Sequence, residues 1–135
     1  MQEQMKVIHH EHGQTTLKLR ADGIVEVLGA GMNYDLEATK EIHQAIKTLT
    51  ANKPSPILIN TEKFTLVDAE TREYLSTDEA NAHATSKAFV ISSLPQKLLL
   101  NFLIKFQKPN CPTRFFADKD SAIQWLYELK ENDQK

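Results

Sequence analysis

The spacing of hydrophobic positions changes along the chain from every second residue to every third or fourth. Residues 15–20 alternate apolar and polar side chains, which is typical of a strand. Ala21-Asp22-Gly23 predicts a turn, and residues 24–28 then form a second predicted strand. From Leu36 onward, apolar positions recur at the spacing of an amphipathic helix that ends before Pro54. The chain is therefore predicted to open with a β-hairpin and a helix.

Short apolar runs then alternate with helical patterns. Three runs have the length and composition of buried strands in a parallel sheet: residues 57–59, 88–91 and 114–116. Further helices are expected over residues 68–82, 95–106 and 122–129. The predicted order is β-β-α-β-α-β-α-β-α, an α/β fold with a mostly parallel sheet, an N-terminal hairpin and four helices.

The domain organisation follows from this order and from the length of 135 residues, which suits one domain. We expect a polar segment over residues 1–14, a single domain over 15–130 and a polar tail over 131–135. The longest apolar run, Leu98 to Ile104, is too short to span a bilayer. The polar start also lacks the apolar stretch of a signal peptide, so the sequence predicts a bacterial-type protein of the cytoplasm.

Charge and candidate chemistry exclude several classes of function. Sixteen basic and eighteen acidic residues give a net charge of −2, so we expect no nucleic acid as partner. Of His9, His10 and His12, which precede the predicted core, only His10 and His12 would share a face of a strand. No third ligand is evident nearby, so no metal site is expected. Gly29-Ala30-Gly31 lacks the third glycine of a dinucleotide loop, so no cofactor is expected, and an enzyme ranks last.

The predicted helix over residues 95–106 is apolar over more of its circumference than one contact with a sheet would bury. Two interpretations stay open. The helix is either sandwiched between the sheet and a neighbouring helix, or it exposes an apolar patch to another protein, a second copy of the chain or a lipid. The residues of this candidate interface are Leu98, Leu99, Phe102, Leu103 and Phe106.

The segment from Ile57-Leu58-Ile59-Asn60 to Asp68-Ala69-Glu70-Thr71 resembles the regulatory centre of STAS domains. The resemblance covers about residues 15–130 and implies the SpoIIAA-like fold. It is closest to uncharacterised STAS-like proteins, through a pattern that includes Ala88-Phe89-Val90, Phe102, Lys108-Pro109 and Ala122-Ile123-Gln124-Trp125-Leu126.

The resemblance implies a non-enzymatic, regulatory protein-interaction module with another protein as its partner. In anti-sigma-factor antagonists of this family, an Asp is followed by two hydroxyl residues, one of them phosphorylated, and by Gly. Here Asp68 matches the Asp, but Ala69 and Glu70 stand at the hydroxyl positions and Thr71 at the glycine, so the usual phosphorylation is not expected. The predicted contact surface consists of Asp68, Ala69, Glu70, Thr71 and Arg72.

A small carrier of an apolar ligand or lipid, similar to CRAL-TRIO domains, is the alternative function. This alternative is based on the apolar helix predicted over residues 95–106, which could line a ligand cavity. A homodimer formed through the same helix is expected to be compatible with either function.

Overall fold

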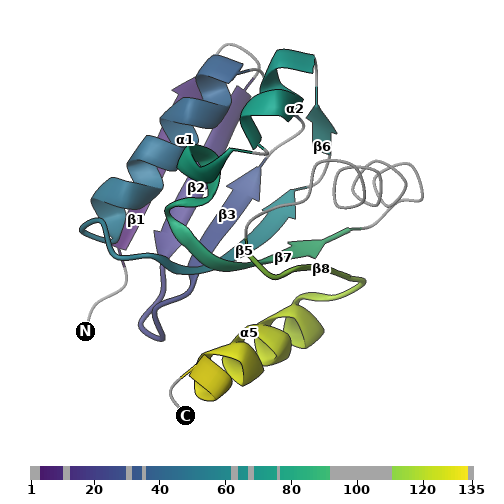
Figure 1. Ribbon diagram of the computed structural model, residues 1–135. Helices are drawn as coiled ribbons and strands as arrows, with labels where there is room; N and C mark the ends of the chain where they lie inside the picture. The colour runs from purple at the N-terminus through teal and green to yellow at the C-terminus, as the bar shows by residue number, and fades with distance from the viewer. Residues whose placement is uncertain are drawn as a thin grey trace.

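A six-stranded mixed sheet forms the centre of the protein (Figure 1). The structure is a computed structural model that describes residues 4–10, 13–29, 32–34, 36–61, 64–66, 69–75, 77–91 and 111–133. The strands of the sheet are β1 (Gln4–His10), β2 (Gly13–Leu19), β3 (Val25–Gly29), β5 (Ser55–Thr61), β7 (Ala84–Val90) and β8 (Thr113–Phe116). They lie side by side in that order, and β1 and β8 form the two edges.

The sheet combines an antiparallel half with a parallel half. Strands β1, β2 and β3 pair antiparallel, whereas β3, β5, β7 and β8 pair parallel. A second, two-stranded parallel sheet consists of β4 (Met32–Tyr34) and β6 (Phe64–Leu66). The described part of the chain is therefore a mixed α/β fold.

Helices cover both faces of the large sheet. Helix α1 (Leu36–Leu49) contacts β1 and β2 on one face of the sheet. The short helices α2 (Ala69–Leu75) and α3 (Asp78–Asn81) come after β6 in the chain. Helix α5 (Lys119–Asp133) packs against β5, β7 and β8 on the opposite face (Figure 1). None of the described helices is long and apolar enough to cross a membrane.

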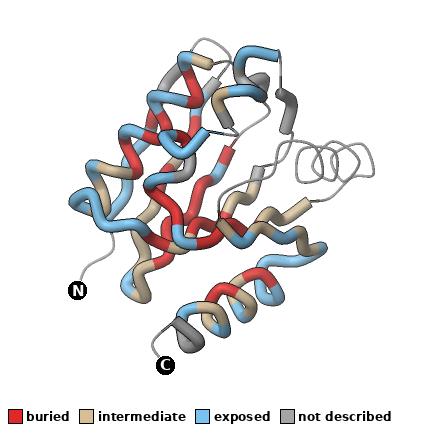
Figure 2. The backbone as a smooth tube through the Cα atoms, viewed as in Figure 1, coloured by how far each residue is buried: buried red, intermediate tan, exposed pale blue. Residues whose placement is uncertain are grey.

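Strand β5 lies in the middle of both hydrophobic cores. Successive strand residues point to opposite faces, so Ile57 packs with Ile42 and Ile46 of α1 while Leu58 packs with Ala122 and Leu126 of α5. Figure 2 shows the buried residues gathered on the central strands and along the inner sides of α1 and α5. This two-sided burial explains why residues 57–59 form a continuous apolar run.

Polar contacts fix α5 at both ends. Near its start, Lys119 Nζ lies 2.7 Å from Glu26 Oε2 of β3, whose side chain is only 4% exposed. In its second half, the Tyr127 hydroxyl donates to Asp22 Oδ2 at 2.6 Å and Lys130 Nζ donates to the Asp22 carbonyl. Burial alone would raise the pKa of Asp22, but hydrogen bonds from Tyr127 and the Ile24 N–H, together with the Arg20 charge, lower it.

The predicted hairpin is confirmed by β2 and β3. The turn between them contains Gly23 with φ of +88°, a conformation that a side chain would strain, and Asp22 Oδ1 accepts the Ile24 N–H. The predicted strands 57–59, 88–91 and 114–116 correspond to β5, β7 and β8, and the helix over 122–129 lies within α5.

The expectation that residues 1–14 precede the folded core is wrong for β1. All seven of its residues pair with β2, and Ile8 is buried against α1. Sequence analysis did not predict this strand because an edge strand buries few side chains. Its backbone hydrogen bonds do not depend on the pattern of hydrophobic residues.

Other differences concern short elements. Strands β4 and β6 were not expected, and the predicted helix over residues 68–82 is divided into α2 and α3. Thr77 begins α3, because its side chain accepts the Ala80 N–H at 3.2 Å. The predicted helix over residues 95–106 lies outside the described residues.

Replacing Lys119 by Met is expected to destabilise the fold by about 1–3 kcal/mol, because it removes an ion-pair partner from a buried carboxylate. Adding Glu26→Gln should recover part of that loss, since the buried group is then neutral. Urea unfolding of the two variants at pH 7 measures both effects. Equal stability of Lys119→Met and the wild type would show that the ion pair does not hold α5.

Candidate functional site

Strand β8 and helix α5 border a shallow hollow, open to solvent, at one edge of the sheet. Alternation along β8 directs Arg114 and Phe116 toward α5, in register with Ala88 and Val90 of β7. Asp118 then begins the helix, because its carboxylate accepts the Ser121 N–H at 2.7 Å. The Ser121 hydroxyl donates a second hydrogen bond to Asp118 Oδ2 at 3.0 Å, and the two bonds lower the pKa of Asp118. Because only two residues separate β8 from α5, the helix lies directly beside the strand face that carries Arg114 and Phe116.

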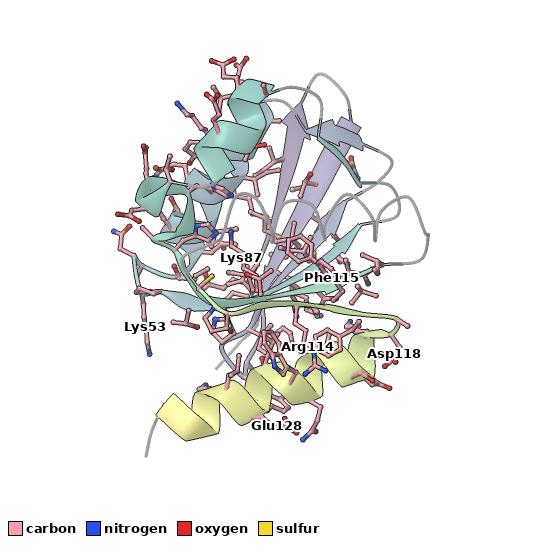
Figure 3. The ribbon with its side chains drawn as sticks, turned by 45° about the vertical axis from the view of Figure 1, so that its right-hand side comes forward. Lys53, Lys87, Arg114, Phe115, Asp118 and Glu128 are labelled. Atoms are coloured by element: carbon pink, nitrogen blue, oxygen red, sulfur yellow. The ribbon has the colours of Figure 1, made fainter. Side chains whose placement is uncertain are left out.

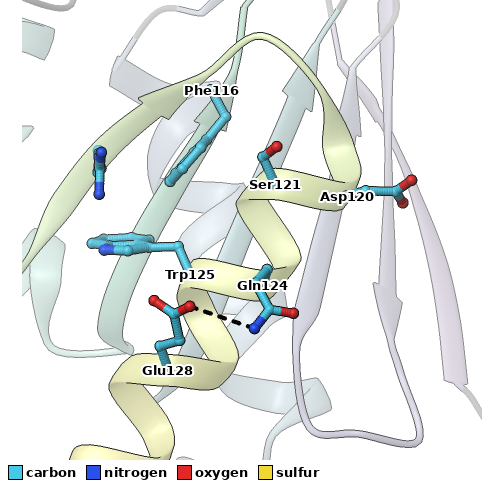
Figure 4. Close-up of a pocket in the computed structure, with 7 residues that line it drawn as sticks. Phe116, Asp120, Ser121, Gln124, Trp125 and Glu128 are labelled. Atoms are coloured by element: carbon cyan, nitrogen blue, oxygen red, sulfur yellow. Dashed lines mark hydrogen bonds between the residues drawn. The ribbon is translucent and has the colours of Figure 1, made fainter.

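The hollow has a volume of about 380 Å³ and an aromatic floor (Figure 4). The ring centroids of Phe116 and Trp125 lie 5.6 Å apart at an angle of 46°. The Arg114 guanidinium carbon lies 5.4 Å from the centre of the Phe116 ring, within the range of a cation–π contact. The described lining is completed by Asp120, Ser121, Gln124 and Glu128.

The polar rim of the hollow is arranged along α5. Asp120, Gln124 and Glu128 follow one another at intervals of four residues, so they share one side of the helix. Gln124 Nε2 donates to Glu128 Oε1 at 3.4 Å (Figure 4). The surface thus combines a half-buried aromatic pair, one guanidinium group and two exposed carboxylates.

A second group of polar residues is buried on the opposite face of the sheet. The rings of His43 on α1 and His83, which precedes β7, are 4.4 Å apart, and His43 Nδ1 lies 3.2 Å from the Tyr74 hydroxyl of α2. His83 Nδ1 is buried without a hydrogen-bond partner among the described residues. Figure 3 shows Lys87 on the α1 side of the strands and Arg114 on the α5 side.

Burial and positive charge keep these histidines neutral. Burial, followed by the neighbouring His83 imidazole and the charges of Lys87 and Lys47, holds the pKa of His43 well below its ordinary value. Burial and the same two lysines lower the pKa of His83 to about 3. Burial also lowers the pKa of Lys87 and raises that of Cys111. The described cluster therefore packs α1 and α2 against β7 as uncharged imidazoles.

The predicted contact surface around residues 68–72 is described in part. Ala69 and Glu70 open α2 and are exposed, and Thr71 and Arg72 lie in the same helix. Asp68 lies outside the described residues, as do Leu98, Leu99, Phe102, Leu103 and Phe106 of the predicted apolar interface. The structure therefore leaves both surfaces as predictions.

Sequence analysis missed the hollow because the apolar spacing of the last predicted helix places Trp125 on the same inner stripe as Ala122 and Leu126. The structure buries Ala122 and Leu126 completely but leaves Trp125 half-buried at the side of that stripe. The sequence did contain one indication of this site. Side chains two residues apart in a strand point to the same face, so Arg114 and Phe116 lie together. What the sequence could not show was that this face meets α5.

The fold described above defines a mixed α/β domain whose exposed site combines aromatic, basic and acidic side chains. The chain belongs to the family described as "Domain of unknown function (DUF7793)", whose model matches residues 17–130. None of the curated proteins matches the chain.

Two solved structures resemble this chain weakly. An uncharacterised DUF3478-family protein with a SpoIIAA-like fold from Shewanella loihica PV-4 is 15% identical with a TM-score of 0.49, covering 92% of this chain and 93% of that one. A protein of unknown function from Arthrobacter sp. FB24 is 23% identical with a TM-score of 0.28, covering 82% and 97%. A TM-score below 0.5 does not by itself assign either fold to this chain.

The buried histidines predict a loss of stability on mild acidification. Their folded pKa values lie below the unfolded value of about 6.5, so their contribution is complete above that pH and is lost as the pH falls toward 3. Each histidine should lower the free energy of unfolding by about 0.7 kcal/mol per pH unit at pH 6.5, and the slope should approach about 1.4 kcal/mol per pH unit near pH 5. Urea unfolding between pH 7 and pH 5 measures the slope.

The variant His83→Leu tests the source of that slope. It removes one titrating group and an unpaired buried nitrogen, so the average slope between pH 6.5 and 5 should fall by about 1 kcal/mol per pH unit. An unchanged slope would assign the acid sensitivity to other groups.

Proposed function

We propose that this domain is a non-enzymatic protein-interaction module that holds a segment of another protein in the hollow between β8 and α5. The observation that carries the proposal is the contact series Arg114–Phe116–Trp125 on an exposed edge of the sheet. Tryptophan, aromatic residues and arginine supply most of the binding energy in protein interfaces. Rigid elements on both sides hold these side chains in place.

The separation of the hollow from the buried cluster favours binding over catalysis. An active site needs its perturbed acid–base groups at the place where substrate binds. Here His43, His83 and Lys87 lie on the α1 face, whereas the hollow lies on the α5 face. Within the described lining, the side chain of Ser121 is hydrogen-bonded to Asp118 rather than to a histidine.

The charges around the hollow indicate the chemistry of the partner. Arg114 is already placed over Phe116, while the carboxylates of Asp120 and Glu128 are exposed on the rim. A segment with an apolar or aromatic anchor and a neighbouring Lys or Arg would stack on Trp125 and meet Glu128. The charged lining supports a peptide partner over an apolar ligand or lipid.

The regulatory role implied by the STAS resemblance would act through control of this contact. The contact surface predicted from the sequence at residues 68–72, with Glu70 exposed at the start of α2, is a second candidate site for binding another protein. Substitutions on each surface therefore distinguish the two within one binding assay.

Selection of peptides from a random displayed library against the whole chain tests the proposal. We expect enriched peptides to contain an aromatic or apolar residue beside Lys or Arg. Because Trp125 is the single tryptophan of the chain, its fluorescence reports directly whether a selected peptide binds at the hollow. Trp125→Ala and Arg114→Ala should each weaken binding at least tenfold, measured by titration calorimetry.

Matched variants make the outcome decisive. Glu128→Lys should weaken binding of basic peptides, whereas Glu41→Ala, which alters an exposed acid on α1, should leave affinity unchanged. If Glu70→Lys removes binding and Trp125→Ala does not, the contact surface is α2. Peptides that bind without changing the tryptophan fluorescence would contradict the assignment to the hollow.

A further inference from the structure

Strand β1 forms an edge of the large sheet that lacks the usual protection against pairing. It is seven residues long and pairs with β2 without interruption, and its other side has no neighbouring strand in the described part of the chain. Natural edge strands are commonly protected by proline, bulges or several charges. Strand β1 contains no proline and a single lysine, Lys6.

Apolar side chains are exposed beside this edge. Met5 is 66% exposed, Val7 44% and Leu28 36%. The register places Val7, Thr16 and Leu28 in one row across β1, β2 and β3, on the face that carries α5 farther along the sheet. Helix α5 covers β5, β7 and β8, so this part of the same face is open.

We propose that a second copy of the chain occupies this edge, with the two β1 strands paired antiparallel about a twofold axis at Val7. The two six-stranded sheets then join into one continuous sheet. Such a contact is self-complementary, because each copy supplies the unpaired backbone groups that the other needs.

The charge of the strand disfavours one register, and the exposed Val7 favours another. With Val7 opposite Val7 of the second copy, Lys6 lies opposite Ile8 and Met5 opposite His9. The lysines therefore do not face each other. A twofold axis at Lys6 would instead place two like charges directly opposite, which destabilises a strand pair. Val7 at the axis also brings two β-branched side chains together, which favours pairing.

Disulfide formation tests the register. In a Cys111→Ser background, Val7→Cys should form an intermolecular disulfide under mild oxidation, because directly opposed residues lie within bonding distance. Met5→Cys is the matched control on the same strand and face. Its copies are offset by four residues, so it should remain reduced. Equal cross-linking of both variants, or none at Val7→Cys, would overturn the proposal.

Sedimentation of the whole chain tests the dimer itself. The wild type should sediment as a dimer, Val7→Lys should raise the dissociation constant at least tenfold, and Leu28→Lys should leave it unchanged. Circular dichroism checks that both variants fold. A wild-type monomer, or a dimer disrupted by Leu28→Lys rather than Val7→Lys, would overturn edge pairing. A monomer that instead pairs with an added extended peptide would assign the edge to a different protein.

Discussion

The structure depends on burying β5 on both of its faces. Ile57 and Leu58 point in opposite directions and are fully enclosed, so a helix is needed on each side of the sheet. Helix α1, which follows β3 and the short strand β4 in the chain, covers one side. The other side is covered by α5, the last element along the chain. The ion pair of Lys119 with Glu26 and the hydrogen bond from Tyr127 to Asp22 fix its position.

The placement of α5 creates the surfaces discussed above. A helix of fifteen residues is about 22 Å long, and it packs against the strands at the β8 end of the sheet. There its outer side meets Arg114 and Phe116, which produces the hollow. At the other end, β1 and β2 are left open on the same face, and Met5 and Val7 are exposed.

The face of the sheet that α1 covers contains buried polar groups as well as apolar side chains. It buries two histidines and a lysine near Cys111, at the cost of keeping the imidazoles neutral and leaving His83 Nδ1 unpaired among the described residues. Perturbed pKa values of this kind are common at catalytic sites but also arise where polar groups are packed into a core. The contacts of His43 with Tyr74 and His83 pack α1 against α2 and the start of β7.

The elements that could be predicted from the sequence are those whose apolar side chains recur at a regular spacing. The hairpin with Gly23, the helix from Leu36 and the strands around Ile57, Ala88 and Phe115 were predicted because each buries a regular row of apolar residues. Tertiary structure decided the rest. Strand β1 is held mainly by backbone hydrogen bonds, and Arg114 meets Trp125 because α5 folds back over β8. Neither relation changes the local pattern of residues, so each becomes visible only when distant segments are brought together.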